Sequence, residues 1–240
     1  MNTDKLLFNF ALATDLHLEV NAYPDVPEAN VRIYCLLDDV NKQHPDFILF
    51  GGDITQRGSA QLDELIIAKE TLDKLKITYF LVAGNHDFAP HREFAAQYPE
   101  KEDYHNGELE SSNFYQVFGD KGMRFSFQKG NIQFIGISLR NNDPDGALDW
   151  LEQEISQTNL PKTVMTHYGI YPPRDSGSPL ESWGFARIGG SIARLRSIIE
   201  GQDSGVIAYL HGHNHINSVI NTTARFETVA LIVTHFLLRS

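Results

Sequence analysis

Histidine, aspartate and asparagine residues recur at five places along the chain, each shortly after a run of apolar residues. Their side chains supply imidazole nitrogens, carboxylate oxygens and one amide oxygen, and no thiolate is among them. This mixture of ligands suits borderline divalent metals such as Mn, Fe, Zn, Co or Ni much better than Ca. The residues are, in chain order, Asp15 and His17, Asp53, Asn85, His86 and Asp87, His167, and His213 and His215.

The apolar runs before these residues predict strands, and stretches with helical spacing lie between several of them. Ile33, Leu37 and Val40, for example, follow one face of a predicted helix. Strands that alternate with helices predict an α/β fold, in which ligands bind at the carboxyl ends of the strands. We therefore expect the five groups to converge. The predicted strands are residues 6–13, 47–50, 78–82, 132–137, 163–165 and 206–210.

The five groups differ in how specific they are. An isolated Asp-x-His or Gly-Asp pair is common, and the latter often only begins a turn. Gly84-Asn85-His86-Asp87 is more informative, because an amide, an imidazole and a carboxylate in a row are costly beside a core strand. The group ending in His213 and His215 could also be a solvated turn. Their common placement at strand ends makes a metal site the better interpretation.

Composition excludes several other classes of protein. The chain has 240 residues and a formal net charge of −11, which disfavours non-specific binding to nucleic acid or anionic membranes. A single cysteine, Cys35, excludes an internal disulfide and a Cys-rich zinc module. The apolar run 6–13 is too short to cross a bilayer and lacks a basic leader. We therefore expect a single domain, residues 1–240, in the cytoplasm.

The ordered motifs resemble those of the calcineurin-like metallophosphoesterases over residues 6–220. The resemblance implies a four-layer α/β/β/α sandwich of two mixed sheets flanked by helices, which alternation alone does not distinguish from one doubly wound sheet. Ala83 and Asp87 stand where the protein Ser/Thr phosphatases carry Arg and Glu. The stretch 52–87 looks most like the class III cyclic-nucleotide phosphodiesterases and their relatives.

The resemblance also implies two divalent metal ions per chain, either Mn, Fe or Zn. A water held between them becomes the nucleophilic hydroxide at neutral pH. His86 would donate a proton to the leaving oxygen or a hydrogen bond to the phosphoryl group, and Asp87 would orient the His86 ring. One metal would be bound by Asp15, His17, Asp53 and His215, and the other by Asp53, Asn85, His167 and His213, with Asp53 bridging the two.

Three functions follow as hypotheses. The first is a phosphodiesterase for a small phosphate ester, such as a cyclic nucleotide or another nucleotide-derived compound. The second is a phosphomonoesterase or a nuclease with the same site, although the negative net charge argues against nucleic acid as a partner. The third is a metal-binding scaffold for protein partners. Scaffold relatives tend to lose ligands or the acid histidine, whereas His86 and all the predicted ligands are present here.

Two long segments, residues 88–121 and 168–187, are candidates for specificity loops. Within the second of them, Arg174 could contact phosphate and Trp183 could stack on a nucleobase. Arg57, just after the turn that carries Asp53, could also contact phosphate. The apolar run 226–238 predicts one closing strand, and its short length after the last histidines makes a homodimer through this end a further expectation.

Overall fold

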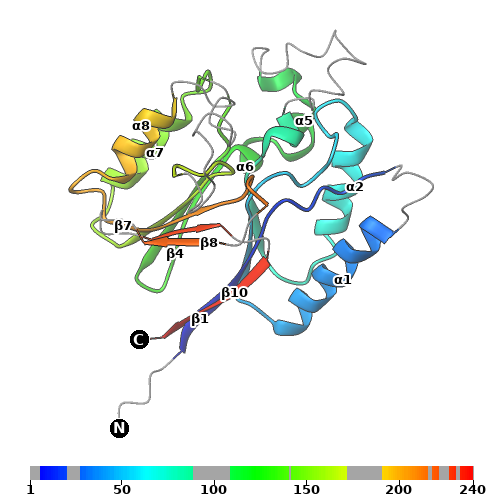
Figure 1. Cartoon of the computed structure of the whole chain (residues 1–240), viewed down its shortest axis with the longest axis horizontal. Helices are drawn as coiled ribbons and strands as arrows, with labels where there is room; N and C mark the ends of the chain where they lie inside the picture. The colour runs from blue at the N-terminus through cyan, green and yellow to red at the C-terminus, as the bar shows by residue number, and fades with distance from the viewer. Residues whose placement is uncertain are drawn as a thin grey trace.

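Two β-sheets packed face to face form the centre of the molecule. The computed structural model describes residues 6–20, 28–88, 109–140, 142–171, 191–215, 218–221, 227–230 and 233–239. Helices α1 and α2 lie on one side of the sheets and α7 and α8 on the other (Figure 1). This four-layer arrangement confirms the predicted α/β/β/α sandwich.

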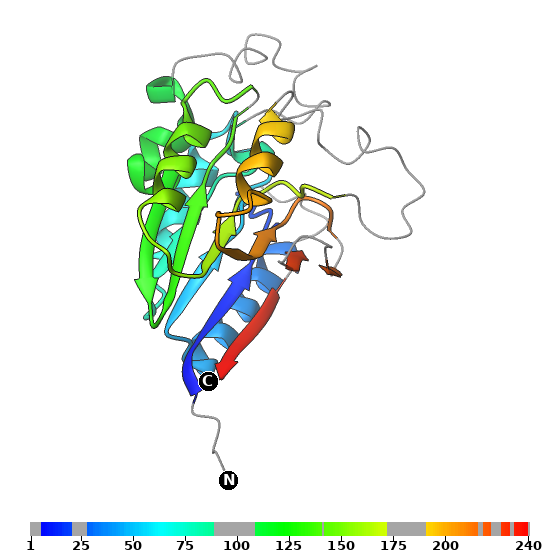
Figure 2. The same ribbon diagram turned by 90° about the vertical axis from the view of Figure 1, so that its left-hand side faces the viewer.

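The first sheet has the strand order β10-β1-β2-β3. Strands β1, β2 and β3 are parallel, and β10 pairs with β1 antiparallel, as Figure 2 shows for the blue and red strands. The strands are β1 (Leu6–Ala13), β2 (Phe47–Phe50), β3 (Tyr79–Leu81) and β10 (Val233–Arg239).

The second sheet has the order β4-β5-β6-β7-β9-β8. Its strands β5, β6, β7 and β9 run parallel, and β4 and β8 are antiparallel to their neighbours. The strands are β4 (Arg124–Lys129), β5 (Ile132–Ile137), β6 (Lys162–Met165), β7 (Val206–His211), β8 (Ser218–Asn221) and β9 (Glu227–Ala230).

Alternate side chains of each strand belong to different cores, because successive residues of a strand point to opposite faces. In β2, Phe47 and Leu49 pack between the two sheets, whereas Ile48 and Phe50 pack against α1 and α2. The layer between the sheets is rich in phenylalanine, with Phe47 and Phe134 at a ring-centroid distance of 5.0 Å. This aromatic layer is composed of Phe8, Phe10, Phe47, Phe80, Phe125, Phe127 and Phe134 together with Leu, Val, Ile and Met side chains.

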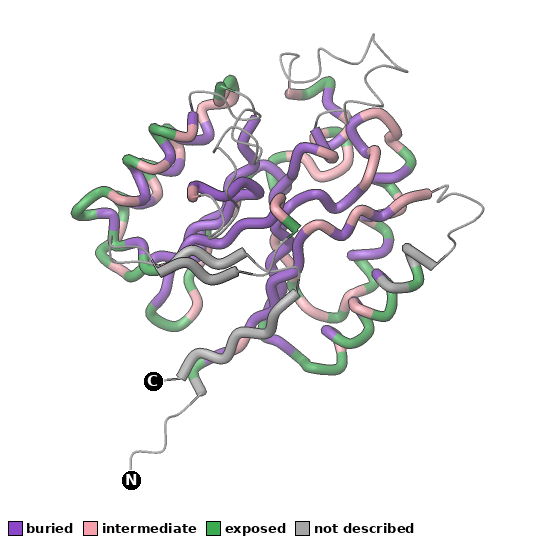
Figure 3. The backbone as a smooth tube through the Cα atoms, viewed as in Figure 1, coloured by how far each residue is buried: buried purple, intermediate pink, exposed green. Residues whose placement is uncertain are grey.

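The helices bury the faces that their spacing predicts. On α1, Ile33 and Leu37 are buried, and the green segments in Figure 3 mark its exposed residues. On α7, Leu148 and Leu151 pack against the second sheet. The longer helices are α1 (Glu28–Gln43), α2 (Leu62–Leu72), α7 (Ala147–Ser156) and α8 (Ser191–Ile199), and the short ones are α3 (Asn85–Phe88), η2 (Leu109–Ser111), α5 (Asn113–Phe118) and α6 (Asp120–Met123).

Some of the strands differ from the sequence prediction. The run 226–238 does not form one strand: β9 pairs with β7 in the second sheet, and β10 pairs with β1 in the first. An apolar run carries no signal for the sheet that it joins, so the division could not be predicted. Strand β4 was not predicted, because its residues are alternately exposed and half-buried and so form no continuous apolar run. Of its side chains, Phe125 and Phe127 pack between the sheets.

The described helices include none that is both long enough and apolar enough to cross a lipid bilayer.

Candidate metal centre

The predicted ligands follow the carboxyl ends of five strands drawn from both sheets. Asp15 and His17 follow β1, Asp53 follows β2, and Asn85 to Asp87 form the start of α3 after β3. The other group comes from the second sheet, where His167 follows β6 and His213 and His215 follow β7. The convergence that the sequence predicts is therefore present, and it joins the two sheets at one end.

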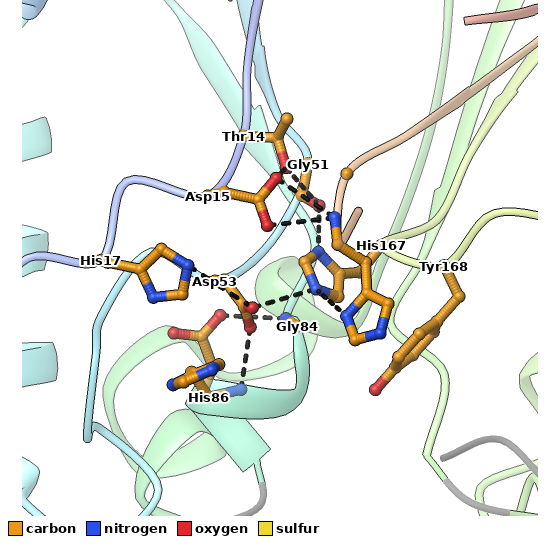
Figure 4. Close-up of polar contacts among 12 residues, drawn as sticks. Thr14, Asp15, His17, Gly51, Asp53, Gly84, His86, His167 and Tyr168 are labelled. Atoms are coloured by element: carbon orange, nitrogen blue, oxygen red, sulfur yellow. Dashed lines mark hydrogen bonds and ion pairs between the residues drawn. The ribbon is translucent and has the colours of Figure 1, made fainter. Parts of the chain in front are cut away.

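Asp53 lies at the centre of the cluster, between His17 on one side and His167 on the other (Figure 4). Its Oδ2 is 3.1 Å from Nε2 of His167 and 3.9 Å from Nε2 of His17. Its Oδ1 accepts a hydrogen bond of 2.8 Å from the backbone N–H of His86. The Asp53 carboxylate therefore faces imidazoles on both sides, and the bridging role that the resemblance implies for it stays a prediction.

The remaining ligands gather on either side of Asp53. On one side, Nε2 of His215 is 3.1 Å from Nε2 of His17 and 3.4 Å from Oδ1 of Asp15. On the other side, Nδ1 of His213 is 3.3 Å from Nε2 of His167. Three groups have ligand atoms within 4.8 Å of one another: Asp15, His17 and His215; Asp53, His167 and His213; and His17, Asp53 and His86.

Each of the first two groups contains three of the four ligands that the resemblance implies for one metal ion. The third places the His86 ring, which the resemblance assigns as a proton donor, beside His17 of the first group and Asp53 of the second. The rings of His17 and His86 meet edge to face with centroids 4.6 Å apart.

Unsatisfied atoms show that these residues fit metal ions. Oδ1 of Asn85 is buried and has no hydrogen-bond partner among the described residues, which is costly for a polar atom. The close nitrogen pairs of His17 with His215 and of His167 with His213 can each share only one proton. Divalent cations at these positions would satisfy both the orphaned oxygen and the facing nitrogens.

Several of the predicted ligands have a left-handed backbone. The φ angles are positive at Asp15 (56°), His17 (48°), Asp53 (48°), His213 (71°) and His215 (52°). This conformation costs a non-glycine residue about 1–2 kcal/mol and persists only where the surroundings impose it. Here the N–H groups of Asp15 and His17 donate to the carbonyls of Gly52 and Asp53, which joins the turns after β1 and β2.

Neighbouring polar groups fix the orientation of the ligands. Nδ1 of His167 is 2.8 Å from the carbonyl oxygen of Gly51, so the ring donates to it and presents Nε2 to Asp53. The hydroxyl of Thr14 donates to Oδ2 of Asp15 at 2.8 Å. Gly84 permits close approach, because a Cβ there would lie 2.2 Å from Oδ1 of Asp53.

The hydrogen bonds described for Asp87 go to groups other than the His86 ring, and its role in orienting that ring stays a prediction. Its fully buried carboxylate accepts hydrogen bonds from the N–H groups of Ile54, Thr55 and Gly84 and from the Thr55 hydroxyl, at 2.8–3.2 Å. Asp87 therefore ties the turn after β2 to the turn after β3. Nδ1 of His86 instead lies 2.7 Å from the backbone carbonyl oxygen of Gln56, a partner whose side chain carries no signal in the sequence.

Charge within the cluster shifts the pKa values of its members in opposite directions. Burial raises the pKa of Asp53, but the nearby His167, His86 and His17 more than offset this and hold it well below its usual range. Burial lowers the pKa of His167, whereas the Asp53 carboxylate raises it, to about 9 as the net result. Burial lowers the pKa of His17 to about 4. In the metal-free protein at pH 7, His167 is thus protonated and His17 is neutral.

This protonation state predicts how metal uptake depends on pH. A metal ion can bind Nε2 of His167 only after its proton leaves, so metal addition at pH 7 should release about one proton from this residue. The apparent affinity for metal should then rise with pH until the pKa of about 9 is passed. Calorimetric titration of Mn²⁺ in buffers with different ionisation enthalpies measures the release, and heats that do not depend on the buffer would contradict it.

Of the three predicted substrate-binding residues, the structure describes only Arg57. Arg57 lies near the cluster, with Nε 3.1 Å from Glu64 and Nη2 3.7 Å from Glu19, and its contact with phosphate stays a prediction. Arg174 and Trp183 lie outside the described residues, as do 89–108 and 172–187 of the two predicted specificity loops. Residues 109–121 of the first loop are described, and they fold into η2, α5 and part of α6.

Sequence reasoning missed several residues that the structure places beside the cluster. The ring of Tyr168 lies 5.1 Å from that of His167 and 5.2 Å from that of His213. Thr14 contacts Asp15, as described above, and directly precedes it. A hydroxyl or a ring next to a metal-ligand motif is a signal that could have identified both.

Comparisons with known proteins agree with this geometry. The sequence profile of the calcineurin-like phosphoesterases matches residues 8–217. A probable glycerophosphodiester phosphodiesterase of Arcobacter nitrofigilis is 27% identical over 211 residues, which cover 84% of this chain and 70% of that protein. A probable cyclic nucleotide phosphodiesterase of Synechococcus is 26% identical over 175 residues, which cover 69% of this chain. The aligned part spans only 59% of the Synechococcus protein.

Solved structures show the same fold. A dimetal phosphatase from Danio rerio superposes with a TM-score of 0.62 at 12% identity, covering 94% of this chain and 87% of that one. A phosphopantetheinyl hydrolase from Mycobacterium tuberculosis superposes with a TM-score of 0.56 at 10% identity, covering 96% and 90%. With most of its length matched by the family profile, the chain belongs to the calcineurin-like phosphoesterase family, which confirms the predicted family, fold and enzyme class.

Proposed function

We propose that this protein hydrolyses a small organic phosphodiester at a two-metal centre. The observation that carries the proposal is the position of Asp53, whose carboxylate faces a group of imidazoles on each side. The named activities of the two relatives, a glycerophosphodiester and a cyclic nucleotide phosphodiesterase, support a diester as the substrate class.

The chain's own side chains would bind two cations of the Mn, Fe or Zn type. Asp15, His17 and His215 would hold one, Asn85, His167 and His213 the other, and Asp53 would touch both. When bound, such a pair of cations neutralises the phosphoryl oxygens and activates a water for attack at phosphorus.

His86 would supply the proton that the leaving group needs. A carbonyl oxygen only accepts hydrogen bonds, so Nδ1 of His86 must carry the proton that lies between it and Gln56. In the imidazolium form, which carries a proton on each ring nitrogen, Nε2 is then the atom that gives its proton to the leaving oxygen, and the ring is left neutral with its proton on Nδ1. As the bond from water oxygen to phosphorus forms, the bond from phosphorus to the leaving oxygen breaks and that oxygen takes the proton.

Three expectations from the sequence complete the proposal: the substrate contains a nucleotide moiety, the protein forms a homodimer, and it is located in the cytoplasm. Nucleic acid is not among the proposed substrates, because the net charge of −11 opposes a polyanion.

Side-by-side hydrolysis of an aryl phosphodiester and the matching monoester tests the proposal. Metal-stripped protein resupplied with Mn²⁺ should prefer the diester in kcat/KM by at least about tenfold, or 1.4 kcal/mol. The same protein without added metal is the control, and it should turn over neither ester.

The other outcomes select the alternatives. A preference for the monoester would overturn the proposal in favour of a phosphomonoesterase. Inactivity on both esters, with metal demonstrably bound, would favour the scaffold hypothesis.

A further inference from the structure

A buried carboxylate on α2 lies close to the metal centre but contacts none of the predicted ligands in the described contacts. Glu64 is 0% exposed. Its Oε2 accepts a hydrogen bond of 2.6 Å from the backbone N–H of Arg57, and its Oε1 accepts one of 3.1 Å from Nε of the same residue. A carboxylate that is taken out of water at this cost calls for an explanation beyond packing.

The peptide unit between Gln56 and Arg57 connects this carboxylate to His86. The C=O of Gln56 and the N–H of Arg57 belong to one planar trans unit and point in opposite directions. On one side of that unit the N–H donates to Glu64, and on the other side the C=O meets Nδ1 of His86 at 2.7 Å. Rotation of the plane would break both contacts together.

We propose that Glu64 is a positioning residue for the reaction, which fixes this peptide plane so that the Gln56 carbonyl holds the His86 ring in its productive orientation. The inference rests on the proposed function, because in that reaction the held ring gives a proton to the leaving oxygen. With Nδ1 held by this hydrogen bond, the ring can neither rotate nor change its tautomer. Nε2 then stays directed at the leaving oxygen.

The ends of the turn are held independently of Glu64. On one side, the Thr55 N–H and hydroxyl donate to Asp87. On the other side, Nδ2 of Asn113 donates to the carbonyls of Gly58 at 3.0 Å and Ser59 at 3.1 Å. Loss of Glu64 should therefore release the plane between Gln56 and Arg57 while the rest of the turn keeps its place.

The groups that shift the pKa of Glu64 are the same backbone and side-chain groups that this carboxylate would hold in place. Burial raises the pKa of Glu64, and hydrogen bonds from the backbone of Arg57 and Val20 together with the Arg57 charge partly offset the rise. Val20 lies shortly after His17, so the carboxylate also joins the segment that follows β1 to the turn after β2.

The dependence of kcat on the leaving group tests the inference, because a loss of protein stability would lower the activity on all diesters alike. In Glu64→Ala, we expect kcat for a diester with an alkoxide leaving group to fall roughly ten- to a hundredfold, the range typical of groups that orient an active-site side chain. A nitrophenolate leaves without a proton, so kcat for its diester should change little. Glu64→Gln, whose amide oxygen can still accept from the Arg57 N–H, should retain more of the alkoxide activity.

Two further measurements separate positioning from a structural role. In a His86→Ala background, Glu64→Ala should cause no further loss, because its effect passes through that ring. In the metal-free protein, ¹H–¹⁵N correlation spectra of the imidazoles should show His86 protonated at Nδ1 in the wild type and as a tautomer mixture in Glu64→Ala. Leu72→Ala, a buried substitution on the same helix, should lower the melting temperature without altering leaving-group dependence.

An equal loss of kcat with both leaving groups, an additive loss in the His86→Ala background, or an unchanged His86 tautomer would each overturn the inference. If the wild-type enzyme hydrolyses neither diester, the proposed function fails instead, and the spectra of the metal-free protein still decide whether Glu64 orients the ring.

Discussion

Replacing His86 with alanine should lower kcat for an alkyl phosphodiester by roughly 10²–10⁴-fold, the usual contribution of a general acid. The reason is geometric: the Gln56 carbonyl holds one nitrogen of the ring, and the ring lies against His17 in the metal cluster. Metal content should stay at the wild-type value. Steady-state kinetics and elemental analysis of the purified variant measure the two quantities.

His44→Asn is a suitable control, because His44 is exposed and the asparagine tolerates its positive φ of 48°. This variant should retain full activity. Loss of about one metal equivalent in His86→Ala would contradict the prediction, since the ring would then be a ligand of the group that it forms with His17 and Asp53.

Asp53→Asn should abolish nearly all activity, because it removes the carboxylate that faces both groups of imidazoles. Metal stabilisation of the reacting phosphate amounts to several kcal/mol, so we expect kcat/KM to fall by about 10³-fold or more. The variant should also bind Mn²⁺ more weakly at both positions. In the metal-free form, loss of the carboxylate should bring the pKa of His167 down from about 9.

Calorimetric titration of Mn²⁺ and NMR titration of the histidine ring signals check these expectations. Asp63→Asn, at an exposed position of α2, provides the same chemical change away from the cluster and should behave as wild type. Binding of two metal ions by Asp53→Asn with wild-type affinity would rule out a bridging role for this carboxylate.

Most of what positions the metal cluster could be predicted from residue types. Runs such as 47–50 and 132–137 are buried along their whole length, and the structure places them as β2 and β5 with the predicted bounds. The polar residues after such runs were easy to identify because their side chains differ sharply from the strands that they follow.

The contacts that orient His86 could not be predicted in this way. Its partner is the carbonyl of Gln56, and every residue has a carbonyl. Glu64 occupies a position in α2 that the sequence alone assigns to the first turn of a helix, where an acidic residue is ordinary. Only the fold shows that this residue is buried and that it contacts the turn after β2.

The number of sheets also could not be predicted from the pattern of apolar residues. A parallel strand buried on both faces reads the same whether it belongs to one sheet or to either of two. The division of β9 and β10 between the sheets illustrates this, since the two strands come from one nearly continuous apolar run. The motif resemblance, rather than periodicity, predicted the two-sheet fold.

The aromatic layer between the sheets has a consequence for the spacing of the predicted ligands. Asp53 and His167 come from different sheets, so their separation of 3.1 Å depends on how thick that layer is. Phe47 and Phe134 lie in that layer, between the two sheets. We therefore expect substitutions in this layer to change the spacing between predicted ligands from the two sheets while every ligand stays in place.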